Sequence, residues 1–88
     1  MKNINLYKEK NKYLIDAVIS EFIKSTTFES GNIKNEFKII SEKEKEYTCI
    51  SWGKTNIKEG DKVKLKIWKL PDVLLVDSII ITQKGETS

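Results

Sequence analysis

Histidine is absent from the 88 residues of the chain, and cysteine occurs once, as Cys49. Histidine is the usual general base near neutral pH and a common metal ligand, so its absence argues against a catalytic or metal centre. One cysteine cannot form an intrachain disulfide, which favours a reducing compartment. The sequence also lacks zinc-ligand spacing and a glycine-rich phosphate loop. It therefore predicts a protein that is not an enzyme and that uses no metal or cofactor.

Arginine is absent as well, and all 16 basic residues are lysines. Arginine supplies the planar fork that contacts bases and phosphates bidentately, so recognition of that kind is not expected. Lysine acts as a point charge instead. Against 13 acidic residues the net charge is +3. This mild excess permits a polyanionic partner but does not require one, because the arrangement of charge on the fold decides.

The sequence has no long apolar run that would be typical of a signal peptide or a membrane span. We expect an intracellular protein without membrane contact, located in the cytoplasm, at the nucleoid, or in the nucleus of a eukaryote. A chain of 88 residues forms one domain. Residues 1–12 are expected to be a partly ordered polar segment, 13–83 the folded domain, and 84–88 a tail.

Alternation of apolar and polar residues is the main structural signal. It is clearest in "KVKLKIW", where Val63, Leu65 and Ile67 are expected to face inward. Four segments are typical of strands: 35–41, 46–52, 62–69 and 73–82. The last is nearly all apolar, as in a strand that is buried on both faces or that crosses a bulge.

Residues 13–25 fit two structures, because their apolar residues alternate as in a strand but also line one face of a helix. A chain this short has to close its sheet, since open edges leave unpaired backbone groups and too small a core. A long, curled first strand completes such a barrel, which favours the strand. The sequence thus predicts an all-β protein, a small five-stranded Greek-key barrel of the oligonucleotide/oligosaccharide-binding type (OB-fold).

The stretch "YTCISWGKTNIKEGDKVKLKI" resembles the third and fourth strands of single-stranded DNA-binding OB domains. The relatives are the replication protein A type and the short single-domain proteins of crenarchaea. The matching residues are Ser51, Trp52, Gly53 and Lys54, then Ile57, Lys58, Glu59 and Gly60. The resemblance spans residues 13–82 and implies the OB-fold, single-stranded DNA as ligand, and stacking rings at Trp52 and near Trp68.

Three features depart from that family. The expected turn at residues 41–46 has Lys45 where the family has glycine. The link between residues 53 and 61 is too short for the helix of longer relatives, and the loop "KLPD" is also short. These departures are typical of a trimmed or specialised member.

Alternation places Trp52 outside the barrel, on the same face as Ile50 and Lys38. Exposing so large an apolar ring forgoes about 1.5–3 kcal/mol of burial, whereas stacking contributes about 1–3 kcal/mol per base. Alternatively, the N-terminal segment or a partner protein covers the ring. Trp68 is also expected to point outward, either toward a ligand or folded over the barrel rim against Leu70.

The other candidates are cations and one loop aromatic. Lysines placed around the tryptophans could neutralise phosphates, although a lysine-rich strand face often serves only to prevent edge pairing. The lysines are Lys38, Lys54, Lys66 and Lys69. Phe28 is the loop aromatic expected to touch a ligand. Five rings, Phe28 among them, are assigned mainly to the core: Tyr13, Phe22, Phe28, Phe37 and Tyr47.

These features predict non-enzymatic binding of single-stranded DNA in replication or repair, with little sequence preference. An RNA strand is not distinguished from DNA, because stacking ignores the sugar. The alternative is a protein-interaction subunit of a larger replication, repair or telomere-type complex. In that case Ile40, Ile50 and Trp52 form an apolar partner surface.

Overall fold

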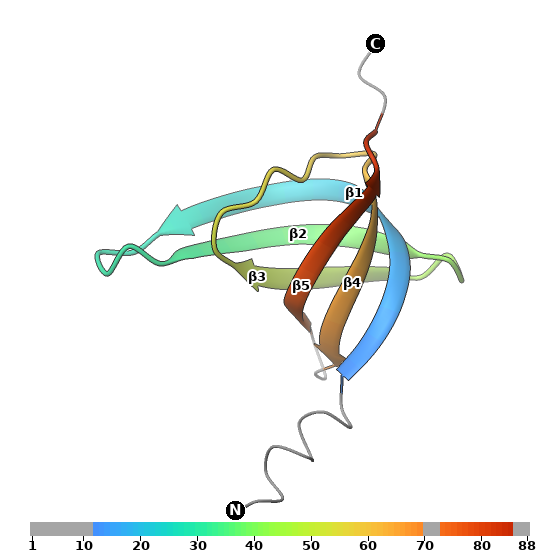
Figure 1. Ribbon diagram of the computed structural model, residues 1–88, viewed down its shortest axis with the longest axis horizontal. Helices are drawn as coiled ribbons and strands as arrows, with labels where there is room; N and C mark the ends of the chain where they lie inside the picture. Colours follow the sequence, from blue (N-terminus) through green and yellow to red (C-terminus); the bar gives the residue numbers. More distant parts are fainter. Residues whose placement is uncertain (1–11, 70–72, 86–88) are drawn as a thin grey trace, which may run out of the picture.

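The computed structural model describes residues 12–69 and 73–85, which contain five strands. These are β1 (Lys12–Thr27), β2 (Ile33–Ser41), β3 (Glu46–Trp52), β4 (Lys62–Lys69) and β5 (Leu74–Gln83). They close into one barrel in the order β1-β2-β3-β5-β4, and β1 pairs with both β2 and β4 (Figure 1). Strands β3 and β5 are parallel, and the other described neighbours are antiparallel. This arrangement confirms the predicted five-stranded OB-fold.

The ambiguous first segment is strand β1, not a helix. Its residues 12–18 pair with β4 and its residues 17–27 pair with β2. Register shifts between Ile19 and Glu21 and between Phe22 and Lys24 let it curl from one side of the barrel to the other. The strand begins at Lys12, one residue earlier than predicted. Residues 1–11, expected to be a partly ordered segment, lie outside the described residues, as do 70–72 and 86–88.

The predicted inward alternation holds in the central strands. The buried apolar residues there are Phe37, Ile39, Cys49, Val63, Leu65 and Ile67. Phe22 and Tyr47 are partly buried against this core. The assignment of Tyr13 to the core was wrong, because its side chain is 50% exposed. Tyr13 lies at the start of β1, on the rim of a cavity of about 470 Å³ that also contacts Tyr47, so the core covers only part of its ring.

Strand β5 changes which residues face inward partway along its length. Leu74 and Val76 are buried, whereas beyond Asp77 the residues that pack on the core are Ile79 and Ile81. The pairing with β4 shifts register at the same point. One extra residue reverses the alternation of a strand. The bulge therefore explains the nearly all-apolar sequence without burial on both faces.

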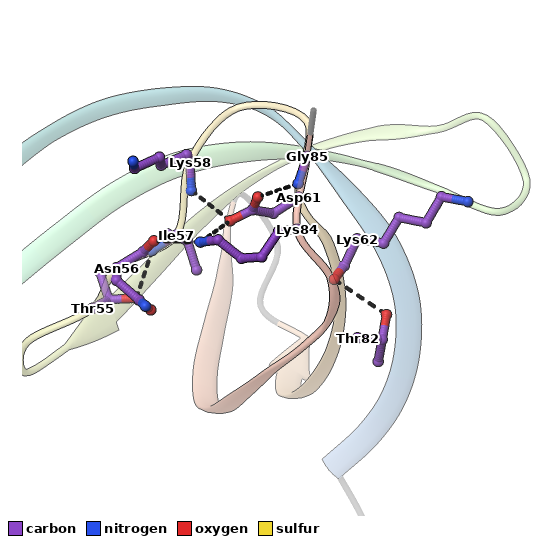
Figure 2. A network of polar contacts seen from close by, with 9 residues as sticks. All are labelled: Thr55, Asn56, Ile57, Lys58, Asp61, Lys62, Thr82, Lys84 and Gly85. Atoms are coloured by element: carbon purple, nitrogen blue, oxygen red, sulfur yellow. Dashed lines mark hydrogen bonds and ion pairs between the residues drawn. The ribbon is translucent and has the colours of Figure 1, made fainter. Parts of the chain in front are cut away.

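The connection between β3 and β4 is tied to the end of β5 by Asp61, whose side chain is buried. The Asp61 carboxylate accepts hydrogen bonds from the backbone N–H groups of Lys58 (2.9 Å) and Gly85 (2.7 Å) and from the Lys84 ammonium (3.2 Å) (Figure 2). Burial by itself would raise the pKa of Asp61, but these hydrogen bonds and the Lys84 charge hold it below its ordinary value. Ile57 of the same connection is buried in the core.

The turn between β2 and β3 is built around Glu44, which has a φ of 62°. Its N–H donates to the Ser41 carbonyl (2.8 Å), and the Ser41 N–H donates to the Lys45 carbonyl (2.9 Å). These bonds are typical of a three-residue hairpin loop that ends in a left-handed residue. The conformation that favours glycine therefore falls on Glu44, one position before the residue singled out in the sequence comparison.

Candidate nucleic-acid interface

An aromatic pair, Phe28 and Trp52, lies at one end of the β1-β2-β3 part of the sheet. Trp52 is the last residue of β3 and is 57% exposed; Phe28 follows β1 and is 44% exposed. Their ring centroids are 6.0 Å apart, with the ring planes tilted by 32°. The predicted outward orientation of Trp52 is confirmed, whereas the assignment of Phe28 mainly to the core was wrong, because the loop after β1 holds its ring at the surface. Both rings lie at the surface although each would gain free energy from burial.

A buried polar network lies beneath this aromatic pair. Asn35 of β2 is buried, and its side-chain nitrogen donates to Ser51 Oγ (3.2 Å) and to the Gly53 carbonyl (2.7 Å). Its side-chain oxygen accepts a hydrogen bond from the Ser25 hydroxyl (2.7 Å). The residues on both sides of Trp52 are therefore bonded to Asn35. This network holds the backbone from which the indole projects.

Gly53 lets the chain leave β3 directly after Trp52. Its φ of +99° lies in the region that favours glycine, and its N–H donates to the Ile33 carbonyl (2.8 Å). Sequence reasoning missed the role of Asn35. The available signal was an amide at an inward-facing position of a predicted strand, where a polar group needs hydrogen-bond partners.

Three of the lysines on this side differ in their surroundings. Lys34, which sequence reasoning also missed, is the cross-strand partner of Trp52 on the outer face. Lys54 is exposed and lines a cleft together with Trp52. Lys38 lies farther along the same face, and its ammonium is 4.0 Å from the Glu21 carboxylate, which partly neutralises it. Lys34 became recognisable only once the register of the β2–β3 pairing was known.

Trp68 has a different environment. It faces outward on β4, as predicted, but is partly buried, and the Lys12 ammonium lies 5.3 Å from its ring centroid. The same ammonium is 3.7 Å from the Asp77 carboxylate. Ile50 of β3 pairs with Leu75 of β5, which in turn pairs with Trp68. An outer apolar row thus joins Ile50 to Trp68, while a cation covers one side of the indole.

The remaining predicted cations, Lys66 and Lys69, both lie on β4. Lys66 is exposed on β4 and pairs with Leu14 and Ser78, so it lies on the β1-β4-β5 side of the barrel. Lys69 is the last residue of β4; its side chain lies outside the described residues. Leu70, the expected neighbour of Trp68, lies outside them too.

Cys49 is fully buried in the core, and burial raises the pKa of its thiol to about 12 because the thiolate loses its hydration. Among residues 12–69 and 73–85, no group of three or more His, Cys, Asp or Glu side chains could hold a metal ion. The same residues contain no helix that is long and apolar enough to span a membrane. The candidate site is therefore the exposed aromatic pair of Phe28 and Trp52, with Lys34 opposite Trp52 on β2 and Lys54 two residues after it.

Comparison of the chain with protein-family models, curated proteins and solved structures finds no match. The fold and the geometry of the surface residues are therefore the basis for assigning a function.

Proposed function

We propose that this protein binds single-stranded nucleic acid, and that its main ligand is DNA. It catalyses no reaction and acts in replication or repair. The observation that carries the proposal is the exposed aromatic pair of Phe28 and Trp52. Phe28 lies in the β1–β2 loop and Trp52 on β3. In OB-folds, the face of strands two and three and the loop between strands one and two bind oligonucleotides.

The two exposed rings can stack on unpaired bases. Base–aromatic stacking contributes about 1–3 kcal/mol per base and tolerates any sequence, because every base has a flat face. Lys34 lies opposite Trp52 on the neighbouring strand β2, and Lys54 follows Trp52 by two residues. Both lysines can neutralise phosphates of a strand that lies across the rings. The resemblance of residues 47–67 to replication protein A-type domains supports the same ligand.

A protein-interaction subunit is the second candidate. The observation that favours it is a pair of exposed aliphatic side chains, Val18 and Ile40, which face each other across β1 and β2 on the outer face. Exposed apolar groups of this kind mark protein interfaces when they form a continuous patch. In this alternative Ile50 and Trp52, farther along the same outer face, also contact the partner, which is another subunit of a replication, repair or telomere-type complex.

The experiment is a fluorescence titration with oligo-dT, oligo-rU and a DNA duplex. It uses Trp68→Phe, because Trp52 is then the sole tryptophan of the chain. Single strands should quench Trp52 emission, and the duplex should do so far less, because paired bases hide their faces. In the wild-type background, Trp52→Ala should weaken binding by about 1–3 kcal/mol. The exposed ring can be removed without loss of the fold, which far-UV circular dichroism checks.

Ile80→Ala is the matched control, because Ile80 is as exposed as Trp52 but lies on β5, paired with Lys64 of β4. It should leave the affinity for oligo-dT unchanged. Lys54→Ala should lower the affinity for all sequences and reduce the salt slope by about 0.7, the value for one phosphate contact on a single strand. A folded Trp52→Ala protein with unchanged affinity would refute the stacking proposal and favour the protein-interaction subunit.

A further inference from the structure

The barrel has a gap beside Trp52. Strands β3 and β5 pair over only three positions, Cys49 to Ser51 with Leu74 to Val76. After that β3 ends, while β5 continues to Gln83 (Figure 1). A cleft of about 310 Å³ lies between β5 and the connection that follows β3. Its volume is at the lower end of the range of about 300–1,000 Å³ for small-molecule sites.

The cleft is lined by side chains from three segments, and besides its polar groups the lining contains the aliphatic residues Ile57, Val76, Ile79 and Ile81. Trp52 and Lys54 come from the end of β3 and the residues after it, Asn56 from the connection, and Asp77 and Ser78 from β5. All five are exposed to solvent. Ser51, which also lines the cleft, is buried and therefore belongs to its floor. The ring of Trp52 thus contacts Phe28 and also forms part of the rim of this cleft.

Hydrogen bonds hold the two walls of the cleft together. The Lys84 ammonium, just beyond β5, donates to the Asn56 carbonyl (3.2 Å) and to the Asp61 carboxylate (3.2 Å) (Figure 2). The Gly85 N–H donates to the same carboxylate (2.7 Å). A cleft that is already formed does not have to be ordered when a ligand binds, which favours affinity.

We infer that this cleft binds one base of the strand that stacks on Trp52, and that it selects bases carrying an exocyclic amino group. The inference rests on the proposed function and adds base selectivity to it. Asp77 is the acidic residue of the cleft, and a carboxylate only accepts hydrogen bonds. Cytosine, adenine and guanine present amino donors, whereas thymine and uracil present a carbonyl oxygen at the corresponding edge.

The neighbouring groups fit this assignment. The Asp77 carboxylate is 3.7 Å from the Lys12 ammonium, and ionised it still has lone pairs for a base amino group. The Asn56 amide and the Ser78 hydroxyl each donate and accept, so they can complete the contacts of either a pyrimidine or a purine. Lys54 at the rim can neutralise the phosphate of that nucleotide.

The test compares the affinities of oligo-dC and oligo-dT of equal length, measured by fluorescence anisotropy of labelled strands. Wild-type protein should bind oligo-dC about tenfold more tightly, within the range for one base-edge contact. Asp77→Asn should reduce the preference to within about twofold, because an amide can donate to thymine as well as accept from cytosine. The affinity for oligo-dT should not fall, since stacking on Trp52 is unchanged.

Two control variants test whether the preference for oligo-dC comes from the Asp77 carboxylate itself. Lys12→Met removes the ion pair but keeps Asp77, so the preference for oligo-dC should persist. Asp16→Asn removes an exposed carboxylate of β1 and should also leave this preference unchanged. In ¹⁵N spectra of the wild-type protein, oligo-dC should shift the Asn56 and Ser78 amides more than oligo-dT does. Equal affinities for the two strands, or a preference that survives Asp77→Asn, would overturn the inference while leaving the proposed function in place. Absence of binding to either strand would overturn both.

Discussion

Trp52 and Trp68 occupy equivalent outward positions in their strands but have different surroundings. Trp52 ends β3 beside Phe28 and Lys34, and most of its surface is exposed. Trp68 is partly buried, with the Lys12 ammonium over its ring. Much of the Trp52 side chain is open to a base, whereas stacking on the covered side of Trp68 requires Lys12 to move. At the scale of single residues, Trp52 is therefore the stronger candidate for a stacking ring.

Cys49 allows a test of strand orientation at the same scale. Because the thiol is fully buried and its pKa is raised to about 12, it should not react with a thiol reagent at pH 8 until the protein unfolds. Cys49→Ser should lower the free energy of unfolding by about 1–3 kcal/mol, since it buries a hydroxyl without an assured partner. Oligonucleotide affinity should not change. Rapid labelling of the native protein would mean that β3 is inverted and that Trp52 faces the core.

At the scale of elements, the β2–β3 hairpin fixes the register that brings Lys34 opposite Trp52. Its turn carries Glu44 in the left-handed conformation. A residue with a Cβ loses roughly 1–2 kcal/mol there, while glycine adopts the same conformation without strain but loses more entropy on folding. The turn is thus a place where the sequence conflicts with the backbone.

Glu44→Gly should raise the free energy of unfolding by about 0.5–1 kcal/mol, the balance of relieved strain and added chain entropy. Urea denaturation monitored by tryptophan emission measures the change. Glu42→Gly is the matched control, because Glu42 is also exposed in the same turn but has no left-handed backbone. It should be destabilising or neutral. If the two substitutions had the same effect, the strain at Glu44 would not be present in solution.

At the scale of the whole molecule, the core is small, so the stability of the fold depends more on the hydrogen bonds that join the ends of the barrel strands. The chain joins β3 to β4 without a helix, and the buried Asp61 carboxylate connects this segment to residues 84 and 85 beyond β5. The same bonds hold the two walls of the cleft beside Trp52 together. Stability and the shape of the proposed base site therefore depend on one ionised group.

Asp61 makes stability depend on acid pH. Its pKa is lowered in the folded protein, so its contribution is present above the unfolded pKa of about 3.9 and is lost as the pH falls through the lower folded value. Asp61→Asn should lower the free energy of unfolding at pH 7 by about 1–3 kcal/mol, as expected for charge-assisted hydrogen bonds. The difference from wild type should shrink as the pH falls below 4.

Urea denaturation at a series of pH values between 7 and 2.5 measures this difference. Asp16→Asn is the control, because Asp16 is an exposed carboxylate 4.0 Å from the Lys64 ammonium. Surface pairs of this kind contribute about 0–1 kcal/mol, so its effect should be small at every pH. If the free energies of unfolding of wild type and Asp61→Asn differed by the same amount at every pH, the proposed dependence of stability on Asp61 ionisation would be contradicted.

Much of the fold follows from alternation and chain length. Period-two patterns in residues 35–41, 46–52 and 62–69 predict strands and their inward residues. The prediction works because successive side chains of an extended backbone point to opposite faces, whatever the rest of the fold. The short chain requires closure, and this resolved the ambiguous first segment as β1. The outward direction of Trp52 follows from the same alternation, since it lies one residue beyond the inward-facing Ser51.

Tertiary structure decided which residues meet. The pairing of β2 with β3 places Lys34 opposite Trp52, the β1–β2 loop brings Phe28 to the same ring, and the separation of β3 from β5 opens the cleft that Asp77 lines. These contacts join residues far apart in sequence. Strand register and bulges set them, and a shift of one residue would send each side chain to the opposite face. Local sequence determines the direction of a side chain in this protein, whereas only the closed barrel determines its neighbours.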